Sequence, residues 1–548
     1  MKIIENMTNG YRKIASGIAI VAFLTLMYFA LIPGGTMAAV YTTSGATIQN
    51  AFVRIVEYPE YNASTDINGN YQINSVPYDA IAGGSTYTMR VKAAGYGPNS
   101  TKVTLNSVTP NPAVNWELYP SDPLYIGFLN DDGTNYISEI QVFNPYNFNI
   151  TVDDPVIRLG VNKTTDYEIL PLTLNSIQTQ QVWGGSFIGS VKVETTQPAK
   201  VQGLLKTINT GIYSIAPARN ISSETIQYIP FLNDAGTAAT RGYDSGIQIF
   251  NPDPVTTINA NISAIRLGES RSINIAIPPM SLAGKMAEQV WGGDFLGSIK
   301  VETDGPALVQ GNLRTLYDLT ASIAPSRTIS SETIQYIPFL NDAGTAATNG
   351  YDSGIQVFNP DPVNTISANI TAIRLGESRS INIIIPPMSL GGKMAEQVWG
   401  GDFLGSIKVE TNGTALVQGN LRTLSTSTAS IAPAMTIPTV ATMYIPYLKD
   451  NGTTYDSGIQ IFNPYQTDTI NATITTYNLL DGQIKSLSFD IPPLSLGGKM
   501  VKNNIVGSDF EGAVKVDTKV GSIPRPALVQ SNIRVRNTMT ASIAPAIE

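Results

Sequence analysis

The stretch Tyr228-Ile229-Pro230-Phe231-Leu232 recurs along the chain and reveals its organisation. The same five residues begin at Tyr336, and the variants Tyr-Ile-Pro-Tyr-Leu and Tyr-Ile-Gly-Phe-Leu begin at Tyr444 and Tyr125. From Tyr125 onward these starts lie 103, 108 and 108 residues apart. A second motif, Ser-Ile-Ala-Pro, closes each unit and ends at Pro217, Pro325, Pro433 and Pro545. Because self-similarity at a fixed period is typical of repeat proteins, the sequence predicts four tandem units.

Each unit has the pattern of a small β-sandwich. In the second copy, Ser272–Ile277 alternates polar and apolar residues and stops at Pro278-Pro279, as a half-buried strand does. Further strands are predicted at residues 228–233, 246–251, 260–267, 285–290, 297–303, 307–316 and 321–325. About seven short strands in ~105 residues is the size of an immunoglobulin-like sandwich. The sequence therefore predicts an all-β fold without long helices.

A separate sandwich is expected before the repeats, at residues 39–120. Strands are predicted at 51–56, 71–76, 87–93 and 115–118, with a turn at Asp66–Asn70. The pieces SGATIQNAFVRI, TDINGNYQI and YTMRVKAAGYGP resemble the carboxypeptidase regulatory-like, or transthyretin-like, domain. That resemblance implies a non-catalytic spacer or attachment module of a secreted protein. The turn is favoured over a calcium loop, because an EF-hand needs a glutamate where this chain has Pro77.

The repeats resemble β-sandwich modules found in large secreted and surface proteins of bacteria and archaea. The resemblance is carried by the Tyr-Ile-Pro-Phe-Leu opening, the strand Ser-Gly-Ile-Gln-Ile-Phe-Asn-Pro, the Pro-Pro turn and the segment Phe-Leu-Gly-Ser. It implies a component of a surface layer, sheath or stalk. The predicted domains are 1–38 (signal peptide or membrane anchor), 39–120 (transthyretin-like), and four immunoglobulin-like repeats at 121–220, 221–328, 329–436 and 437–548.

The composition excludes several kinds of chemistry. The 548 residues contain no cysteine and no histidine, so disulfides, thiolate nucleophiles, zinc sites and Ser-His-Asp triads are ruled out. Charged residues make up only 14% of the chain, and the net charge of −8 disfavours nucleic acid as a partner. No catalytic residue is predicted, and the chain is expected not to be an enzyme.

The N-terminus has the layout of a targeting segment. Lys2, Arg12 and Lys13 precede an apolar run from Ile14 to Ile32, and Thr36-Met37-Ala38 offers small residues before a cleavage site. The run is nearly long enough to span a bilayer, so an uncleaved anchor is the alternative to a secretory signal. In both cases the remainder is expected outside the cell or on its surface.

A tryptophan recurs in three of the four units. Trp183, Trp291 and Trp399 stand 108 residues apart in Val-Trp-Gly-Gly-x-Phe, and Val506 takes this position in the fourth unit. A ladder of such rings could stack on sugars. The other interpretation, a plug that closes the end of each sandwich core, is favoured because tryptophan usually supplies buried area.

Pairs of aspartates flank one loop in each of the later repeats: Asp234 with Asp244, Asp342 with Asp352, and Asp450 with Asp456. Two carboxylates and loop carbonyls could hold Ca²⁺, which takes six to eight oxygen ligands. Roles in turns and helix caps are the favoured alternative. A glycosidase pair is disfavoured, because that chemistry needs one cleft rather than several similar loops.

Asparagine sequons are frequent in the exported part of the chain. If the source glycosylates asparagine, the candidates are Asn62, Asn99, Asn149, Asn162, Asn220, Asn261, Asn369, Asn412, Asn451 and Asn471.

Together these features predict an exported structural protein that builds a surface layer, sheath or filament. Exposed edge strands and head-to-tail contacts of rigid sandwiches would drive self-association. Its expected partners are other copies of itself and, in the alternative reading as an adhesin or carbohydrate-binding stalk, cell-surface glycans. A secreted enzyme is the remaining alternative. No cofactor is expected apart from the alternative of Ca²⁺.

Overall fold

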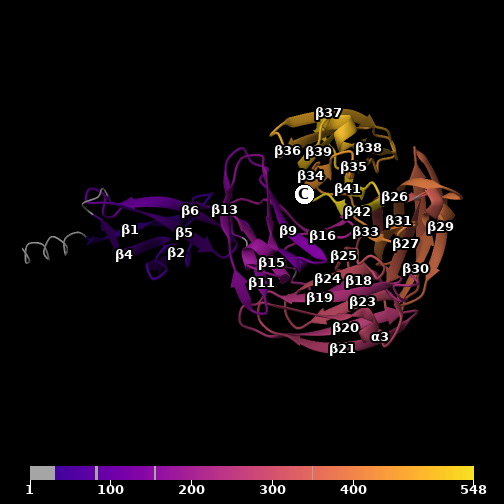
Figure 1. The fold of residues 1–548 in the computed structure, drawn as a ribbon, viewed down its shortest axis with the longest axis horizontal. Coiled ribbons are helices and arrows are strands. Elements are labelled where there is room, and N and C mark those ends of the chain that lie inside the picture. Colours follow the sequence, from indigo (N-terminus) through magenta and orange to yellow (C-terminus); the bar gives the residue numbers. More distant parts are fainter. Residues whose placement is uncertain (1–30, 80–83, 154–155, 222, 349) are drawn as a thin grey trace, which may run out of the picture. The chain divides into compact units, whose positions relative to one another are not determined.

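The computed structural model describes residues 31–548 except 80–83, 154–155, 222 and 349. The chain forms two compact units: residues 1–123 with 150–153 and 194–198, and the rest of the chain from Leu124 to Glu548 (Figure 1). Strands dominate both units, and no described helix exceeds six residues. The predicted all-β array of sandwiches is therefore confirmed. No helix within the described ranges is long and apolar enough to cross a membrane.

In the first unit, two sheets with strand orders β4-β1-β7 and β3-β2-β5-β6 enclose a core that includes Val53, Ile73, Met89 and Trp116. Residues 1–30, with most of the predicted targeting segment, lie outside the described part of the chain. Strand β1 begins at Leu31, inside the predicted segment, and pairs with β4. The strands are β1 (Leu31–Thr42), β2 (Phe52–Ile55), β3 (Asn62–Ser64), β4 (Asn70–Asp79), β5 (Ser85–Ala93), β6 (Tyr96–Leu105), β7 (Trp116–Leu118) and β10 (Ile150–Asp153).

Repeats 2 and 3 are each a pair of four-stranded antiparallel sheets, and in repeat 4 the short strand β40 adds a fifth strand to one of the two sheets. Repeat 2 illustrates the plan. One sheet has the order β18-β23-β20-β21 and the other β22-β19-β24-β25. Ile229, Ile262 and Ile299 from the first sheet pack against Ile247 and Val309 from the second, because alternate residues of each strand face inward. Its elements are β18 (Ile226–Asp234), β19 (Tyr243–Asn251), β20 (Ile258–Arg266), β21 (Glu269–Ile277), β22 (Ser281–Met286), α3 (Ala287–Trp291), β23 (Phe295–Thr303), β24 (Leu308–Thr315) and β25 (Ala321–Pro325).

The other repeats follow this plan, with shorter pieces in repeat 1. Repeat 1 contains β8 (Leu124–Asp131), β9 (Tyr136–Phe143), β11 (Val156–Arg158), β12 (Val161–Lys163), β13 (Asp166–Ile169), β14 (Leu174–Gln178), α2 (Thr179–Trp183), β15 (Phe187–Thr195), β16 (Lys200–Thr207) and β17 (Tyr213–Pro217). Repeat 3 contains β26 (Ile334–Asp342), η1 (Ala346–Thr348), β27 (Tyr351–Asn359), β28 (Ile366–Arg374), β29 (Glu377–Ile385), β30 (Ser389–Met394), α4 (Ala395–Trp399), β31 (Phe403–Thr411), β32 (Leu416–Thr423) and β33 (Ala429–Pro433). Repeat 4 contains β34 (Thr442–Asp450), β35 (Tyr455–Phe462), β36 (Ile470–Asn478), β37 (Ile484–Ile491), β38 (Leu496–Met500), η2 (Val501–Val506), β39 (Phe510–Val520), β40 (Ile523–Pro524), β41 (Leu528–Val535) and β42 (Thr540–Pro545).

The prediction of a strand at residues 285–290 is wrong from Ala287 onward. Strand β22 ends at Met286, and the five-residue helix α3 follows it. The backbone N–H of Glu288 donates to Oδ2 of Asp234 at 2.7 Å. A buried carboxylate from β18 thus supplies an acceptor to the free N–H groups of this first turn. Gly292, with φ 86°, ends the helix in the left-handed conformation that favours glycine.

The four repeats close into a ring. The last strands of successive repeats, β17, β25, β33 and β42, contact one another in order, and β42 returns to β17 (Figure 1). The Ser-Ile-Ala-Pro motif makes these contacts specific. The hydroxyl oxygens of Ser214, Ser322 and Ser430 accept hydrogen bonds, 2.9–3.1 Å long, from the backbone N–H of the isoleucine in the next repeat's motif. The four sheets that contain β17, β25, β33 and β42 are thus arranged around the ring like the blades of a propeller.

Aromatic pairs join neighbouring repeats at the same four places. The tyrosine that opens each repeat's Tyr-Ile-Pro-Phe-Leu motif or its variant packs on the phenylalanine of the next repeat's Phe-Asn-Pro segment. Ring centroids lie 5.9–6.1 Å apart in the pairs Tyr125–Phe250, Tyr228–Phe358, Tyr336–Phe462 and Tyr444–Phe143. Because the last pair joins repeat 4 to repeat 1, the end-to-end contacts of the repeats are satisfied within one chain.

Candidate functional site

The recurring tryptophans lie in or beside the sandwich cores. Trp291 and Trp399 expose 9% and 8% of their surface and belong to the cores of repeats 2 and 3. The guanidinium groups of Arg271 and Arg379, on β21 and β29, lie 4.7 Å from the two ring centroids and cover them. Trp183 is half-buried, with Lys163 over its ring. The placement of Trp291 and Trp399 fits the plug and leaves no open face for a sugar.

The first aspartate of each predicted pair caps the short helical segment of its own repeat. Asp234 and Asp342 accept hydrogen bonds from the N–H groups of Glu288 and Glu396, both at 2.7 Å. Asp450 does the same for Lys502 at 3.0 Å, and Asp131 of repeat 1 does so for Gln180.

The second aspartate of each pair has a different partner. Asp244, Asp352 and Asp456 form ion pairs with Arg314, Arg422 and Arg534 of the neighbouring strand. No group of three or more acidic residues in the described ranges could hold a metal ion. The predicted calcium ligands are thus not gathered into one cluster, and the cap and turn roles account for their contacts.

Burial alters the titration of the capping aspartates. It raises the pKa of Asp234 and of Asp342 to about 6, although the N–H groups of Glu288 and Glu396 lower it. Burial also raises the pKa of Asp131 and of Asp450. When folding raises the pKa of a carboxyl, protonation of that carboxyl stabilises the folded state. This contribution is complete below the pKa of the unfolded state and is lost as the pH rises through the pKa of the folded state.

Replacing both carboxyls by amides, as Asp234→Asn with Asp342→Asn, is therefore expected to stabilise the ring at pH 7.5. The gain is at most about 3 kcal/mol per residue, at 1.36 kcal/mol per pKa unit, because the amide nitrogen cannot accept the second backbone N–H, that of Ser245 or Ser353. It should vanish as the pH falls toward 4. Denaturant unfolding at the two pH values measures it. The matched control, Asp294→Asn with Asp402→Asn in exposed loops of the same repeats, should change stability by less than about 0.5 kcal/mol. A loss of stability at pH 7.5 in the first variant would contradict the burial argument.

The sequon asparagines all lie outside the cores. Five are exposed, namely Asn62, Asn149, Asn162, Asn220 and Asn412. The other five are half-buried, namely Asn99, Asn261, Asn369, Asn451 and Asn471. Their glycosylation stays a prediction.

Cavities that sequence reasoning missed lie at three junctions between repeats. The first, about 170 Å³, is lined by residues that include Phe128, Asn130, Asp244 and Arg314. Its counterpart between repeats 2 and 3 measures about 290 Å³, and the one between repeats 3 and 4 about 380 Å³. Each combines an aromatic pair and an asparagine from one repeat with the aspartate–arginine pair of the next. The sequence shows that the asparagine of Tyr-Ile-Pro-Phe-Leu-Asn-Asp recurs. It does not show that this asparagine lies beside the aspartate–arginine pair of the next repeat.

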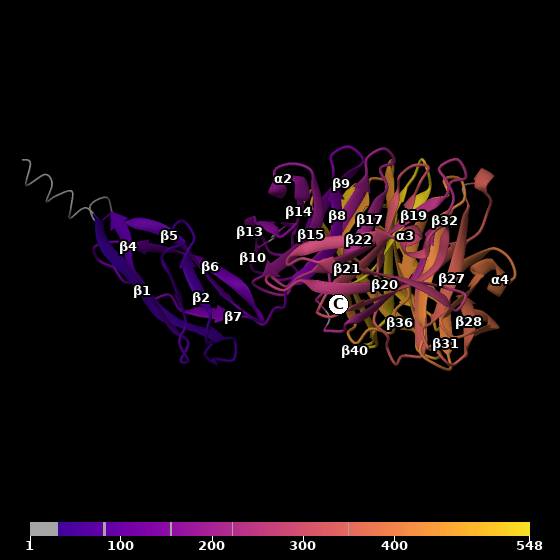
Figure 2. The same cartoon turned by 90° about the horizontal axis from the view of Figure 1, so that it is seen from below.

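The outermost strands of repeats 2, 3 and 4 form an exposed rim. Strands β21, β29 and β37 are terminal in their sheets and are hydrogen-bonded to one neighbouring strand each. They lie at the outside of the ring, and β21 comes to the front when the view is turned (Figures 1 and 2). Ile384 on β29 and Ile484 on β37 expose 67% and 53% of their surface.

No family model matches the chain, and no curated protein matches it significantly. One solved structure found by comparison is the crystal structure of a tetra-tandem repeat in the extending region of a large adhesion protein. It is 9% identical, with 94% of this chain and 99% of that chain covered, at a TM-score of 0.10. A likeness at this TM-score supports no conclusion about fold or function.

Proposed function

We propose that the chain is an exported structural protein of the cell surface, and that its ring is a building block of a surface layer, sheath or filament. The observation that carries this proposal is the rim of three exposed terminal strands, β21, β29 and β37. A terminal strand presents unpaired backbone N–H and C=O groups, which readily pair with a strand of another copy.

The side chains of two of the rim strands, β21 and β29, favour such pairing, whereas β37 carries Lys485 and Asp490. Strands β21 and β29 read Glu-Ser-Arg-Ser-Ile-Asn-Ile followed by apolar residues, and most of their side chains are exposed. The pattern contains serine, asparagine and isoleucine, and its only charges lie at the start of the strand. Lysine and proline, with which proteins blunt exposed edges, are absent from both strands.

Closure of the ring limits how copies can associate. The aromatic pairs and serine hydrogen bonds between repeats form within one chain, and they include the pair that joins Tyr444 to Phe143. Head-to-tail contacts of the repeats are therefore not the route to a polymer, and association through the rim takes their place. Export rests on the N-terminal targeting pattern, and the absence of histidine and cysteine supports a non-enzymatic role.

Electron microscopy of the purified chain tests the proposal. We expect ordered sheets, tubes or fibres in the wild type, both with and without millimolar Ca²⁺, because the loop aspartates already have protein partners. The variant Ala276→Lys with Ile384→Lys places charges on exposed positions of β21 and β29 and should abolish the order.

The matched control places the same charges in exposed loops of the same repeats. Val255 and Val363 expose 81% and 77% of their surface, so Val255→Lys with Val363→Lys should leave assembly intact. Dispersed single rings in the wild type under all conditions would rule out autonomous assembly.

A further inference from the structure

The outer edges of the four repeats differ in length. In repeats 2 and 3 the edge is one unbroken strand of nine residues, β21 or β29, and the first seven residues of the two strands are identical. The corresponding stretch of repeat 1 is divided between β12 and β13, which have three and four residues and pair with different strands. Very short strands are one way in which proteins protect an edge from pairing. Repeat 1 therefore lacks a long edge.

The edges also differ in charge at one position, the residue before the last isoleucine of the strand. This residue is Glu168 in repeat 1 and Asp490 in repeat 4, but Ala276 in repeat 2 and Ile384 in repeat 3. All four are exposed. A strand of another copy laid along the edge would take water from the carboxylate, at a free-energy cost that an alanine or isoleucine does not have. The ring thus has two open edges, on the neighbouring repeats 2 and 3.

The tight turn before β21 determines which backbone groups of this edge are free. Leu267 and Gly268, with φ 51° and 82°, form a two-residue turn, and Arg266 pairs with Glu269 across it. In an antiparallel ladder every second pair exchanges hydrogen bonds, and the pair that closes such a turn is one of them. The residues between these pairs turn their N–H and C=O groups away from β20: Ser270, Ser272, Asn274 and Ala276.

These free groups match those of a second copy of the same strand. A two-fold axis at Ile273 sets Ser272 opposite Asn274 of the second copy and Ser270 opposite its Ala276, so that each free group has a partner. All nine residues then overlap, and the half-buried Ile273 lies beside the same residue of the other copy. Strand β29 follows the same kind of turn, and its equivalent central residue is Ile381.

We propose that β21 and β29 are the two joining edges of the ring, and that each pairs antiparallel with β21 or β29 of a second copy. This inference rests on the proposed structural role and narrows its rim from three strands to two. Because each edge accepts one strand, a copy with two open edges joins two others. The copies therefore form rows, as in a filament, whereas a two-dimensional layer requires further contacts.

Single cysteines report the register directly, since the natural chain contains none. Across a pair without hydrogen bonds the Cα atoms lie ~4.5 Å apart, a distance that a disulfide spans. Under mild oxidation, Ile273→Cys with Ile381→Cys should give a ladder of covalent multimers on non-reducing gels. The control is Ser270→Cys with Ser378→Cys on the same exposed edges, where the thiols are ~20 Å apart in this register and the chain should stay monomeric. Equal cross-linking of both variants would overturn the register.

Charging one edge at a time counts the joining edges without altering the half-buried isoleucines. Ile384→Lys on β29 leaves β21 open, so assembly should stop at pairs of rings in sedimentation velocity. Its matched control, Val363→Lys in an exposed loop of the same repeat, should assemble as the wild type does. Ile484→Lys on the exposed side of β37 should also leave the rows intact. Long rows from Ile384→Lys, or lost assembly in Ile484→Lys, would overturn the assignment of two edges.

The structural role and the filament fail in different ways. Ordered two-dimensional layers of the wild type in electron micrographs would overturn the two-edge inference and leave the structural role standing. A wild type that stays as single rings would overturn both.

Discussion

A chain that ends at Met539, and so lacks strand β42, is expected to lose the cooperative unfolding of the ring. Ile543 exposes only 6% of its surface and packs in the core of repeat 3, although it belongs to repeat 4. Strand β42 also contacts β17 of repeat 1. Its removal opens two junctions at once, at a cost of more than about 5 kcal/mol, which is comparable to the whole stability of many domains. Thermal unfolding followed by near-ultraviolet circular dichroism measures the loss.

A point variant separates packing from chain length. Ile543→Ala should cost about 2–4 kcal/mol through the cavity that it leaves. The control, Ile523→Ala in the same repeat, alters a side chain that is 69% exposed and should cost less than about 0.5 kcal/mol. A truncated chain with the wild-type unfolding midpoint would show that the ring does not depend on its closing strand.

Trp291→Ala and Trp399→Ala are each expected to destabilise the protein by about 3–5 kcal/mol, the usual cost of removing a buried tryptophan. Each indole packs on a core phenylalanine at 5.8 Å between centroids, Phe295 in repeat 2 and Phe403 in repeat 3. Denaturant unfolding measures the change in free energy.

Repeat 1 supplies the matched comparison for these tryptophans. Trp183 is half-buried, so Trp183→Ala should cost clearly less than Trp291→Ala. The same variants decide between the two interpretations of the tryptophan ladder. Unchanged stability combined with lost binding to glycans would restore the sugar-stacking role and contradict the plug.

Local sequence patterns were sufficient for most strands and failed where a distant residue decides the backbone. The predicted strand at 272–277 lies within β21, because its alternation of polar and apolar residues is a local property. The strand predicted at 285–290 is wrong from Ala287 onward, where helix α3 begins. The carboxylate that caps this helix belongs to Asp234, which lies 54 residues before Glu288, the residue whose N–H it accepts. The aspartate motif was recognised, but its role depends on a partner that spacing does not reveal.

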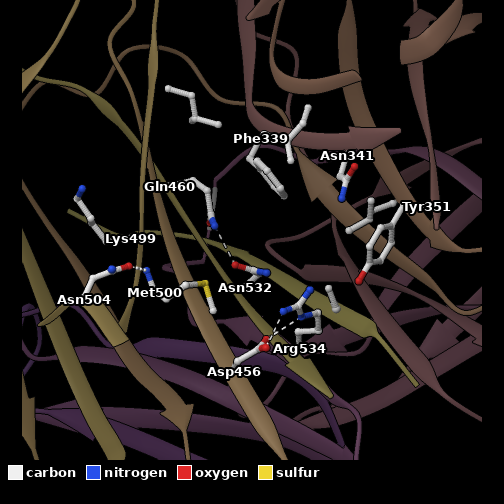
Figure 3. A pocket seen from close by; sticks show the side chains of 15 residues that line it. Phe339, Asn341, Tyr351, Asp456, Gln460, Lys499, Met500, Asn504, Asn532 and Arg534 are labelled. Atoms are coloured by element: carbon white, nitrogen blue, oxygen red, sulfur yellow. Dashed lines mark hydrogen bonds and ion pairs between the residues drawn. The ribbon is translucent and has the colours of Figure 1, made fainter. Parts of the chain in front are cut away.

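The sequence by itself determined that the chain is all-β, that it contains four copies of one unit, and where each copy opens and closes. These properties follow from periodicity and turn residues, which act over a few neighbouring positions. Only the tertiary structure decided that the copies form a ring, that Tyr444 meets Phe143, and that cavities lie at three of the junctions, the largest of which is shown in Figure 3. The reason is geometric. Closure depends on small rotations between packed sandwiches, which accumulate over four repeats. The sequence pattern of a single repeat does not show these rotations.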